Sequence, residues 1–115
     1  MNLTKTHNIS TISNNQEIRY ILNKGQKVYT KFGLIFMLSD SEDKKIQTAV
    51  LLKKKVGSAV KRNYIKRIIK NFFVNNLSLF KNYNRIIFLY SFEGDIKYRE
   101  LEQVYLNALT RTWKE

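Results

Sequence analysis

The sequence predicts an α+β sandwich, in which three helices pack against one small sheet. Segments rich in β-branched and aromatic residues alternate with segments whose apolar residues recur every three or four positions, which indicates strands and helices. Apolar residues make up 43% of the 115 residues, enough for a single hydrophobic core. No linker, repeat or proline divides the chain, so we predict one domain over residues 1–115.

The N-terminal region is predicted to hold a short helix after a flexible segment. Residues 1–13 are polar and are expected to be loosely held. The helix is predicted from Asn15 to Lys24, because its apolar residues lie on one side. Asn14 or Asn15 can cap its start, and Gly25 suits a left-handed C-cap at its end.

The middle of the chain is predicted to form two strands separated by a polar turn. β-Branched and aromatic residues fill 28–38, which indicates one strand that bends at Gly33. Residues 39–45 form the polar turn, and residues 46–53 form a second strand that ends in three lysines.

The C-terminal half is predicted to contain two helices and a third strand. A helix follows Gly57 and covers 58–75, and an apolar strand covers 85–92. A last helix is predicted over 97–113, where apolar residues recur at helical spacing: Leu101, Val104, Tyr105, Ala108 and Leu109.

The predicted helix at 58–75 has one apolar face and one basic face. At about 100° per residue, the apolar side chains share one arc of the helix. This arc holds Tyr64, Ile65, Ile68, Ile69 and Phe72, and Phe73 lies at its edge. The opposite arc holds Arg62, Asn63, Lys66, Arg67 and Lys70. Lys61 falls on the apolar side, in the first turn, where its long side chain can reach water. We therefore expect the apolar face to pack on the sheet and the basic face to point outward.

The distribution of charge predicts a polyanionic partner. The formal net charge is +12, and no acidic residue occurs between Lys44 and Glu93. A solvated surface helix usually mixes charges of both signs, whereas the spacing Arg62–Lys66–Lys70 places like charges one turn apart. Phosphates can replace the missing carboxylates, and RNA that is bound through its backbone and shape fits best.

The composition also excludes several kinds of site. Because cysteine is absent, disulfides, thiolate chemistry and cysteine-based zinc sites are excluded. The start lacks an apolar signal segment and no apolar run is long enough to span a membrane, which predicts a soluble cytoplasmic protein. The only histidine, His7, lies in a polar segment, and Asp40, Glu42 and Asp43 are expected in a solvated loop. No catalytic or metal-ligating residue is predicted in this chain.

The segment 54–67 resembles the signature of the protein subunit of bacterial ribonuclease P. That signature contains paired lysines, a glycine, Ala-Val, an Arg-Asn-Arg core and a following Lys-Arg. Tyr64 stands where the family has the second arginine of the core, and weaker similarity extends over 16–25 and 98–109. The matching residues are Lys54, Lys55, Gly57, Ala59, Val60, Arg62, Asn63, Lys66 and Arg67.

The resemblance implies both a fold and a role. The implied fold is of the ribosomal S5 domain 2-like type, with about four strands and three helices. It contains a left-handed β-α-β crossover, whereas such crossovers are usually right-handed. The role is that of an accessory subunit of an endoribonuclease, which removes the 5′ leader of precursor tRNA to form the mature 5′ end. The implied partners are a catalytic RNA and precursor tRNA, and the chemistry is expected in the RNA and its Mg²⁺ ions.

Two binding surfaces follow from the resemblance. The catalytic RNA is expected to meet Lys53, Lys54, Lys55, Arg62, Asn63, Tyr64, Lys66, Arg67 and Lys70. The single-stranded leader is expected in a cleft between the first helix and the sheet, at Ile18, Leu22, Phe36 and Lys53. The family usually has phenylalanine in place of Ile18 and Leu22, so we expect apolar packing there more than base stacking.

Three other functions stay open at this point. The chain could be a structural RNA-binding protein of the ribosomal type without a role in tRNA processing, or a self-contained nuclease. Its amphipathic basic helix could also bind a membrane surface, although the sheet needs the same apolar stripe. The DNA-reading modules are absent from the sequence, so DNA is not an expected partner.

Overall fold

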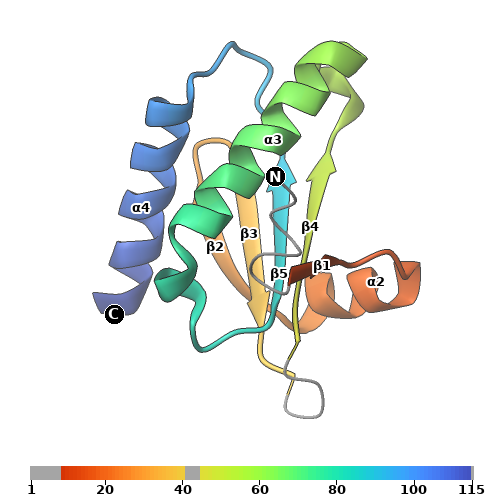
Figure 1. The fold of residues 1–115 in the computed structure, drawn as a ribbon, viewed down its shortest axis with the longest axis vertical. Coiled ribbons are helices and arrows are strands. Elements are labelled where there is room, and N and C mark those ends of the chain that lie inside the picture. The colour runs from red at the N-terminus through yellow and green to blue at the C-terminus, as the bar shows by residue number, and fades with distance from the viewer. Residues whose placement is uncertain (1–8, 41–44, 115) are drawn as a thin grey trace.

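The computed structural model describes residues 9–40 and 45–114, which form one mixed five-stranded sheet with helices on both faces (Figure 1). The strands are β1 (Ile9–Thr11), β2 (Gln26–Thr30), β3 (Gly33–Leu38), β4 (Ile46–Leu52) and β5 (Arg85–Tyr90). The α-helices are α2 (Asn15–Lys24), α3 (Ala59–Asn75) and α4 (Tyr98–Lys114), and short 3₁₀ turns cover Lys54–Val56 and Leu77–Phe80. The predicted α+β class is confirmed.

The sheet order is β1-β4-β5-β3-β2, so the C-terminal strand β5 lies in the centre. β4 is parallel to β1 and to β5, whereas β3 is antiparallel to β2 and to β5. Four strands were expected, and the short β1 is the additional one.

The helix α3 connects the adjacent parallel strands β4 and β5. In Figure 1 both strands point upward, α3 lies in front of the sheet, and β5 lies to the left of β4. This arrangement makes the β-α-β crossover left-handed, an exception to the strong preference for right-handed units. The crossover places α3 and α4 on the same face of the sheet.

The two faces of the sheet carry separate apolar cores. The larger core lies under α3 and α4 and contains a cluster of aromatic rings with centroid distances between 5.0 and 6.5 Å: Phe32, Phe72, Phe73, Phe80, Phe88, Tyr90 and Tyr105. The smaller core lies under α2 and consists of Ile12, Ile21, Phe36, Ala49 and Ile87. Residues of one strand alternate between the two cores, because successive side chains point to opposite faces.

The single bent strand predicted over 28–38 is wrong: this segment forms the hairpin of β2 and β3. Thr30 pairs with Gly33, and the hydroxyl of Thr30 donates to the Gly33 carbonyl at 2.8 Å, which closes the turn. Gly33 has φ +140°, and a Cβ there would lie 2.0 Å from the carbonyl oxygen of Leu89. Glycine is therefore required at Gly33 by the close approach of β5 as well as by the backbone conformation.

Two predictions near the N-terminus also need correction. Residues 9–13 are not loosely held, because Ile9 and Ile12 are buried and β1 pairs with β4. Residues 1–8 lie outside the described residues. Of the two candidate caps, Asn14 is the one that caps α2. Gly25 is extended (φ −68°, ψ 154°) and not left-handed, because the chain passes directly into β2.

The packing of α3 on the sheet can be tested by truncating its buried side chains. Ile68 is 4% exposed and Phe72 is fully buried. Replacing either with alanine is expected to lower the free energy of unfolding by about 2–5 kcal/mol, measured by urea denaturation. Asn71→Ala, on the exposed side of the same helix, is the control and should change stability by less than about 0.5 kcal/mol. Equal effects in all three variants would contradict the assigned faces.

Candidate nucleic-acid interface

The start of α3 is fixed by a turn that the sequence specifies locally. Gly57 has φ 147°, a conformation that favours glycine, and lets the chain turn directly after the buried Val56. The hydroxyl of Ser58 then accepts a hydrogen bond from the backbone N–H of Lys61 at 3.3 Å and caps the helix. The predicted helix start at residue 58 is thus correct to within one residue.

The two predicted faces of α3 are confirmed by the burial of its side chains. The buried residues are Ile65, Ile68, Ile69, Phe72 and Phe73. On the opposite side, Asn63, Arg67 and Lys70 are exposed, while Arg62 and Lys66 are half-buried. We call Arg62, Asn63, Lys66, Arg67 and Lys70 the basic face. Phe73, placed at the edge of the apolar arc by the wheel, is only 2% exposed and belongs to the core.

No cation of the basic face forms an ion pair with any residue in the described ranges. The ion pairs there join Lys31 to Glu100, Lys61 to Asp95, and Arg85 to Glu17 and Asp40. Four cations therefore lie on one helical face without a carboxylate of the described residues to neutralise them, an arrangement that favours a polyanionic ligand.

Lys61 behaves differently from the expectation that its side chain reaches water. Its ammonium donates to the carbonyl of Glu93 at 2.6 Å and lies 3.7 Å from the carboxylate of Asp95. These contacts join the first turn of α3 to the segment between β5 and α4. Lys61 is therefore a structural residue, which explains why it can lie on the apolar side of the wheel.

Arg62 is less exposed than Arg67 and Lys70 of the same basic face. Its Nε is shielded from solvent and has no hydrogen-bond partner in the described part of the chain. A buried donor without a partner is costly, and any contact of Arg62 with an anion must use the other N–H groups of the guanidinium. Arg62 thus combines a packing role with a candidate phosphate contact.

Tyr64 lies at the edge of the apolar face and is 36% exposed, so its placement within the buried arc is wrong. The guanidinium of Arg67 lies 5.7 Å from the centre of its ring, in cation–π contact. The ring is therefore available on the surface beside the basic face, where the related signature has an arginine.

Three further lysines precede α3. Lys53, Lys54 and Lys55 are all exposed. The backbone N–H of Lys53 donates to the carbonyl of Tyr90, and the N–H of Val56 donates to the carbonyl of Lys53. The backbone of this turn is thus tied to β5 and its ammonium groups are free to reach a ligand.

Two shallow hollows flank the exposed side of α3. One has a volume of about 330 Å³ and is lined by Asn63, Lys66, Arg67, Lys70 and Asn71. The other has a volume of about 610 Å³ and is lined by Ser58, Val60, Lys61, Asn63, Tyr64, Arg67 and Asp95. Asn63 and Arg67 line both, so they occupy the middle of the candidate interface.

The residues predicted to form a second site lie around α2, but they are not equally accessible. Ile18 and Leu22 are half-buried and pack against the smaller core. Phe36 is only 4% exposed, so it supports α2 and cannot offer its ring to a base. Lys53 is exposed beyond the end of β4.

The sequence reasoning missed an apolar row on the same face of the sheet. Tyr29 pairs with Leu34, Leu34 with Leu89, and Leu89 with Leu51, so these four residues cross four strands in line. The leucines are half-buried, and Tyr29 is 73% exposed at the edge. We call this row the apolar strip. The alternation of side chains within each strand was visible in the sequence, but the strand order that aligns the row was not.

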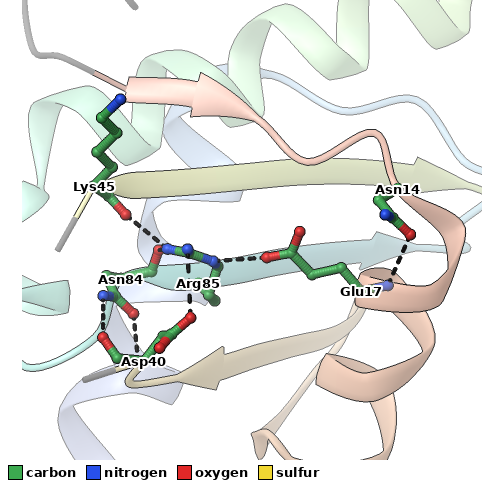
Figure 2. Close-up of polar contacts among 6 residues, drawn as sticks. All are labelled: Asn14, Glu17, Asp40, Lys45, Asn84 and Arg85. Carbon is green, nitrogen blue, oxygen red and sulfur yellow. Dashed lines mark hydrogen bonds and ion pairs between the residues drawn. The ribbon is translucent and has the colours of Figure 1, made fainter. Parts of the chain in front are cut away.

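The predicted acidic loop is only partly within the described residues. His7, Glu42 and Asp43 lie outside them. Asp40 is not simply solvated, because its carboxylate lies 3.6 Å from the guanidinium of Arg85 (Figure 2). Within the described ranges, no three His, Cys, Asp or Glu residues gather to hold a metal ion, and no helix is long and apolar enough to cross a bilayer.

Comparison with known proteins agrees with this geometry. Residues 6–113 match the family model described as Ribonuclease P. The ribonuclease P protein component of Clostridium botulinum (strain Langeland) is 28% identical over 102 residues, covering 87% of this chain and 91% of the relative. That of Natranaerobius thermophilus is 25% identical over 105 residues, covering 90% of each protein.

Solved structures show the same fold. The Staphylococcus aureus RNase P protein, in a mutant described as defective in mRNA degradation, superposes with a TM-score of 0.78 at 22% identity, covering 96% of this chain and 91% of that one. The RNase P protein from Thermotoga maritima gives a TM-score of 0.73 at 17% identity, covering 88% and 96%. Because the family model spans nearly the whole chain, this protein belongs to the ribonuclease P protein family.

Proposed function

We propose that this chain is the protein component of ribonuclease P, which binds the catalytic RNA and assists removal of the 5′ leader from precursor tRNA. The observation that carries this proposal is the basic face, whose cations have no ion pair within the described residues. In a chain of this family, such a face is best explained by contact with RNA phosphates.

The chain is an accessory subunit, and cleavage takes place in the RNA partner. The basic face offers guanidinium, ammonium and amide groups, which bind phosphate but are poor ligands for Mg²⁺, an ion that prefers carboxylate and phosphate oxygens. Mg²⁺ held by the RNA would activate the attacking water and stabilise the leaving oxygen. The protein's own task is to neutralise phosphates and hold the two RNAs in register.

The leader binds on the opposite face of the sheet, along the apolar strip and the half-buried side chains of Ile18 and Leu22. These groups offer apolar contact to unpaired bases without reading their sequence, and Tyr29 adds a ring on which a base can stack. Lys53, exposed at the end of β4, can reach a leader phosphate. Phe36 contributes indirectly, as the buried support of Ile18 and Leu22.

Binding to the catalytic RNA is expected to depend on Arg67. Arg67→Ala should weaken binding and reduce the slope of log affinity against log salt by about 1, because one phosphate contact is lost. Arg99→Ala, which removes an exposed arginine from α4, is the matched control and should leave both quantities unchanged. Filter binding at several salt concentrations measures the effect, and an unchanged slope would contradict the assignment. Arg62→Ala is less suitable because its buried Nε gives it a packing role as well.

The function itself is tested by reconstitution with ribonuclease P RNA. Adding the protein should lower the Mg²⁺ concentration required for cleavage of precursor tRNA, because its cations replace part of the screening by free ions. An unchanged Mg²⁺ requirement despite RNA binding would favour a structural RNA-binding protein of the ribosomal type. Cleavage by protein from which all RNA has been removed would favour a self-contained nuclease.

A further inference from the structure

A buried arginine joins α2 to the central strand of the sheet. Arg85 is the first residue of β5 (Figure 2) and is only 4% exposed. Its Nε donates to the carboxylate of Glu17, in the first turn of α2, at 2.8 Å. We call this pair the arginine tether. The two residues lie 68 positions apart in the sequence, so the contact exists only in the folded protein.

The remaining donors of Arg85 fix the guanidinium itself. Nη1 donates to the carbonyl of Lys45 at 2.7 Å and to that of Asn84 at 2.9 Å, and Nη2 lies 3.6 Å from the carboxylate of Asp40. The Asn84 side chain also accepts from the N–H of Asp40 and donates to its carbonyl (Figure 2). The guanidinium is held by residues at both ends of the loop between β3 and β4 and by the start of β5. It therefore forms a fixed point to which Glu17 binds.

Apolar contacts alone hold α2 weakly. Of its ten residues only Ile21 is buried, and a helix of this length is not stable in isolation. A hollow of about 380 Å³ separates part of α2 from the end of β3, and Glu17, Tyr20 and Arg85 are among the residues that line it. Apolar burial is also non-directional, whereas a charge-assisted hydrogen bond to a guanidinium fixes an orientation. The tether therefore adds a directional contact to the packing of α2 on the sheet.

The tether acts on the surface to which the proposed function assigns the leader. Glu17 directly precedes Ile18, and Leu22 follows one helical turn later. Arg85 lies on the same face of β5 as Ile87 and Leu89, because side chains of a strand alternate. A rotation of α2 about its buried Ile21 would thus move Ile18 and Leu22 relative to the apolar strip.

We propose that the Arg85–Glu17 pair is a positioning device, which sets the place of Ile18 and Leu22 beside the apolar strip and so determines affinity for the tRNA leader. This inference rests on the proposed function. Neither residue needs to touch RNA, so their effect is confined to substrates that carry a leader.

The test uses reconstituted holoenzyme containing Glu17→Ala, and compares binding of precursor tRNA with that of mature tRNA, which lacks the leader. The variant should weaken precursor binding by about three- to tenfold, the size expected for losing one oriented charge-assisted contact, and leave mature tRNA binding unchanged. Glu17→Gln should retain most of the affinity, because its amide oxygen can still accept from Nε of Arg85. Arg85 keeps Asp40 and two carbonyl partners in both variants, so the protein is expected to fold.

A matched control separates the tether from a general change of charge. Glu100→Ala also removes one carboxylate and one ion pair, the exposed contact with Lys31 on the other side of the sheet. It should leave the preference for precursor over mature tRNA at its wild-type value. Equal weakening of both tRNAs by Glu17→Ala, or the same loss of preference in Glu100→Ala, would overturn the positioning role.

Amide hydrogen exchange of the free protein gives a readout that does not depend on RNA. Glu17→Ala should accelerate exchange in α2 while leaving α3 and β5 unchanged, and unaltered exchange in α2 would overturn the tether. If wild-type holoenzyme does not prefer precursor tRNA, the leader-binding part of the proposed function fails instead. The two failures are therefore distinguishable.

Discussion

Burial of one face of α3 against the sheet is the interaction on which the rest of the molecule depends. Each large apolar side chain that the helix buries contributes about 1.5–3 kcal/mol. Repulsion between like charges one turn apart on its outer face costs only about 0.2–0.5 kcal/mol per pair. The free energy gained by burial therefore exceeds the cost of charge repulsion. The same packing that stabilises the domain holds Arg67 and Lys70 toward the solvent. The packing that stabilises the domain and the proposed RNA contacts thus lie on opposite sides of one helix.

The two faces of the sheet differ in how completely helices cover them. The face under α3 and α4 is filled by interlocking aromatic rings and forms the rigid core. The face under α2 is covered by a single short helix with one buried residue, so an apolar row remains half-exposed there. That incomplete cover is what makes the second face suitable for a flexible, single-stranded ligand. On this face the buried Arg85 adds an ion pair with Glu17 of α2 to the small apolar contact of that helix.

Local signals predicted the helices well because each depends on neighbouring residues. The 3.6-residue period and the Gly57-Ser58 start located α3 within one residue, and the cap of α2 proved to be Asn14, one of the two candidates. Errors arose where a partner distant in sequence decided the outcome. Gly33 suggested a bend within one strand. In the structure it is the first residue of the separate strand β3, and glycine is needed there because Leu89 of β5 approaches so closely. The side chain of Lys61 was expected in water, but it binds the carbonyl of Glu93, 32 residues away.

The sequence by itself determined the class of fold, the faces of α3 and the positive charge of its outer side, because periodicity and charge are properties of neighbouring residues. It also carried the motif that identifies the family. Only the tertiary structure decided that β5 lies in the centre of the sheet, that Tyr29 is aligned with three leucines, and that Arg85 reaches Glu17. Strand order and register bring together residues that no local pattern relates, and the candidate leader surface consists largely of such residues.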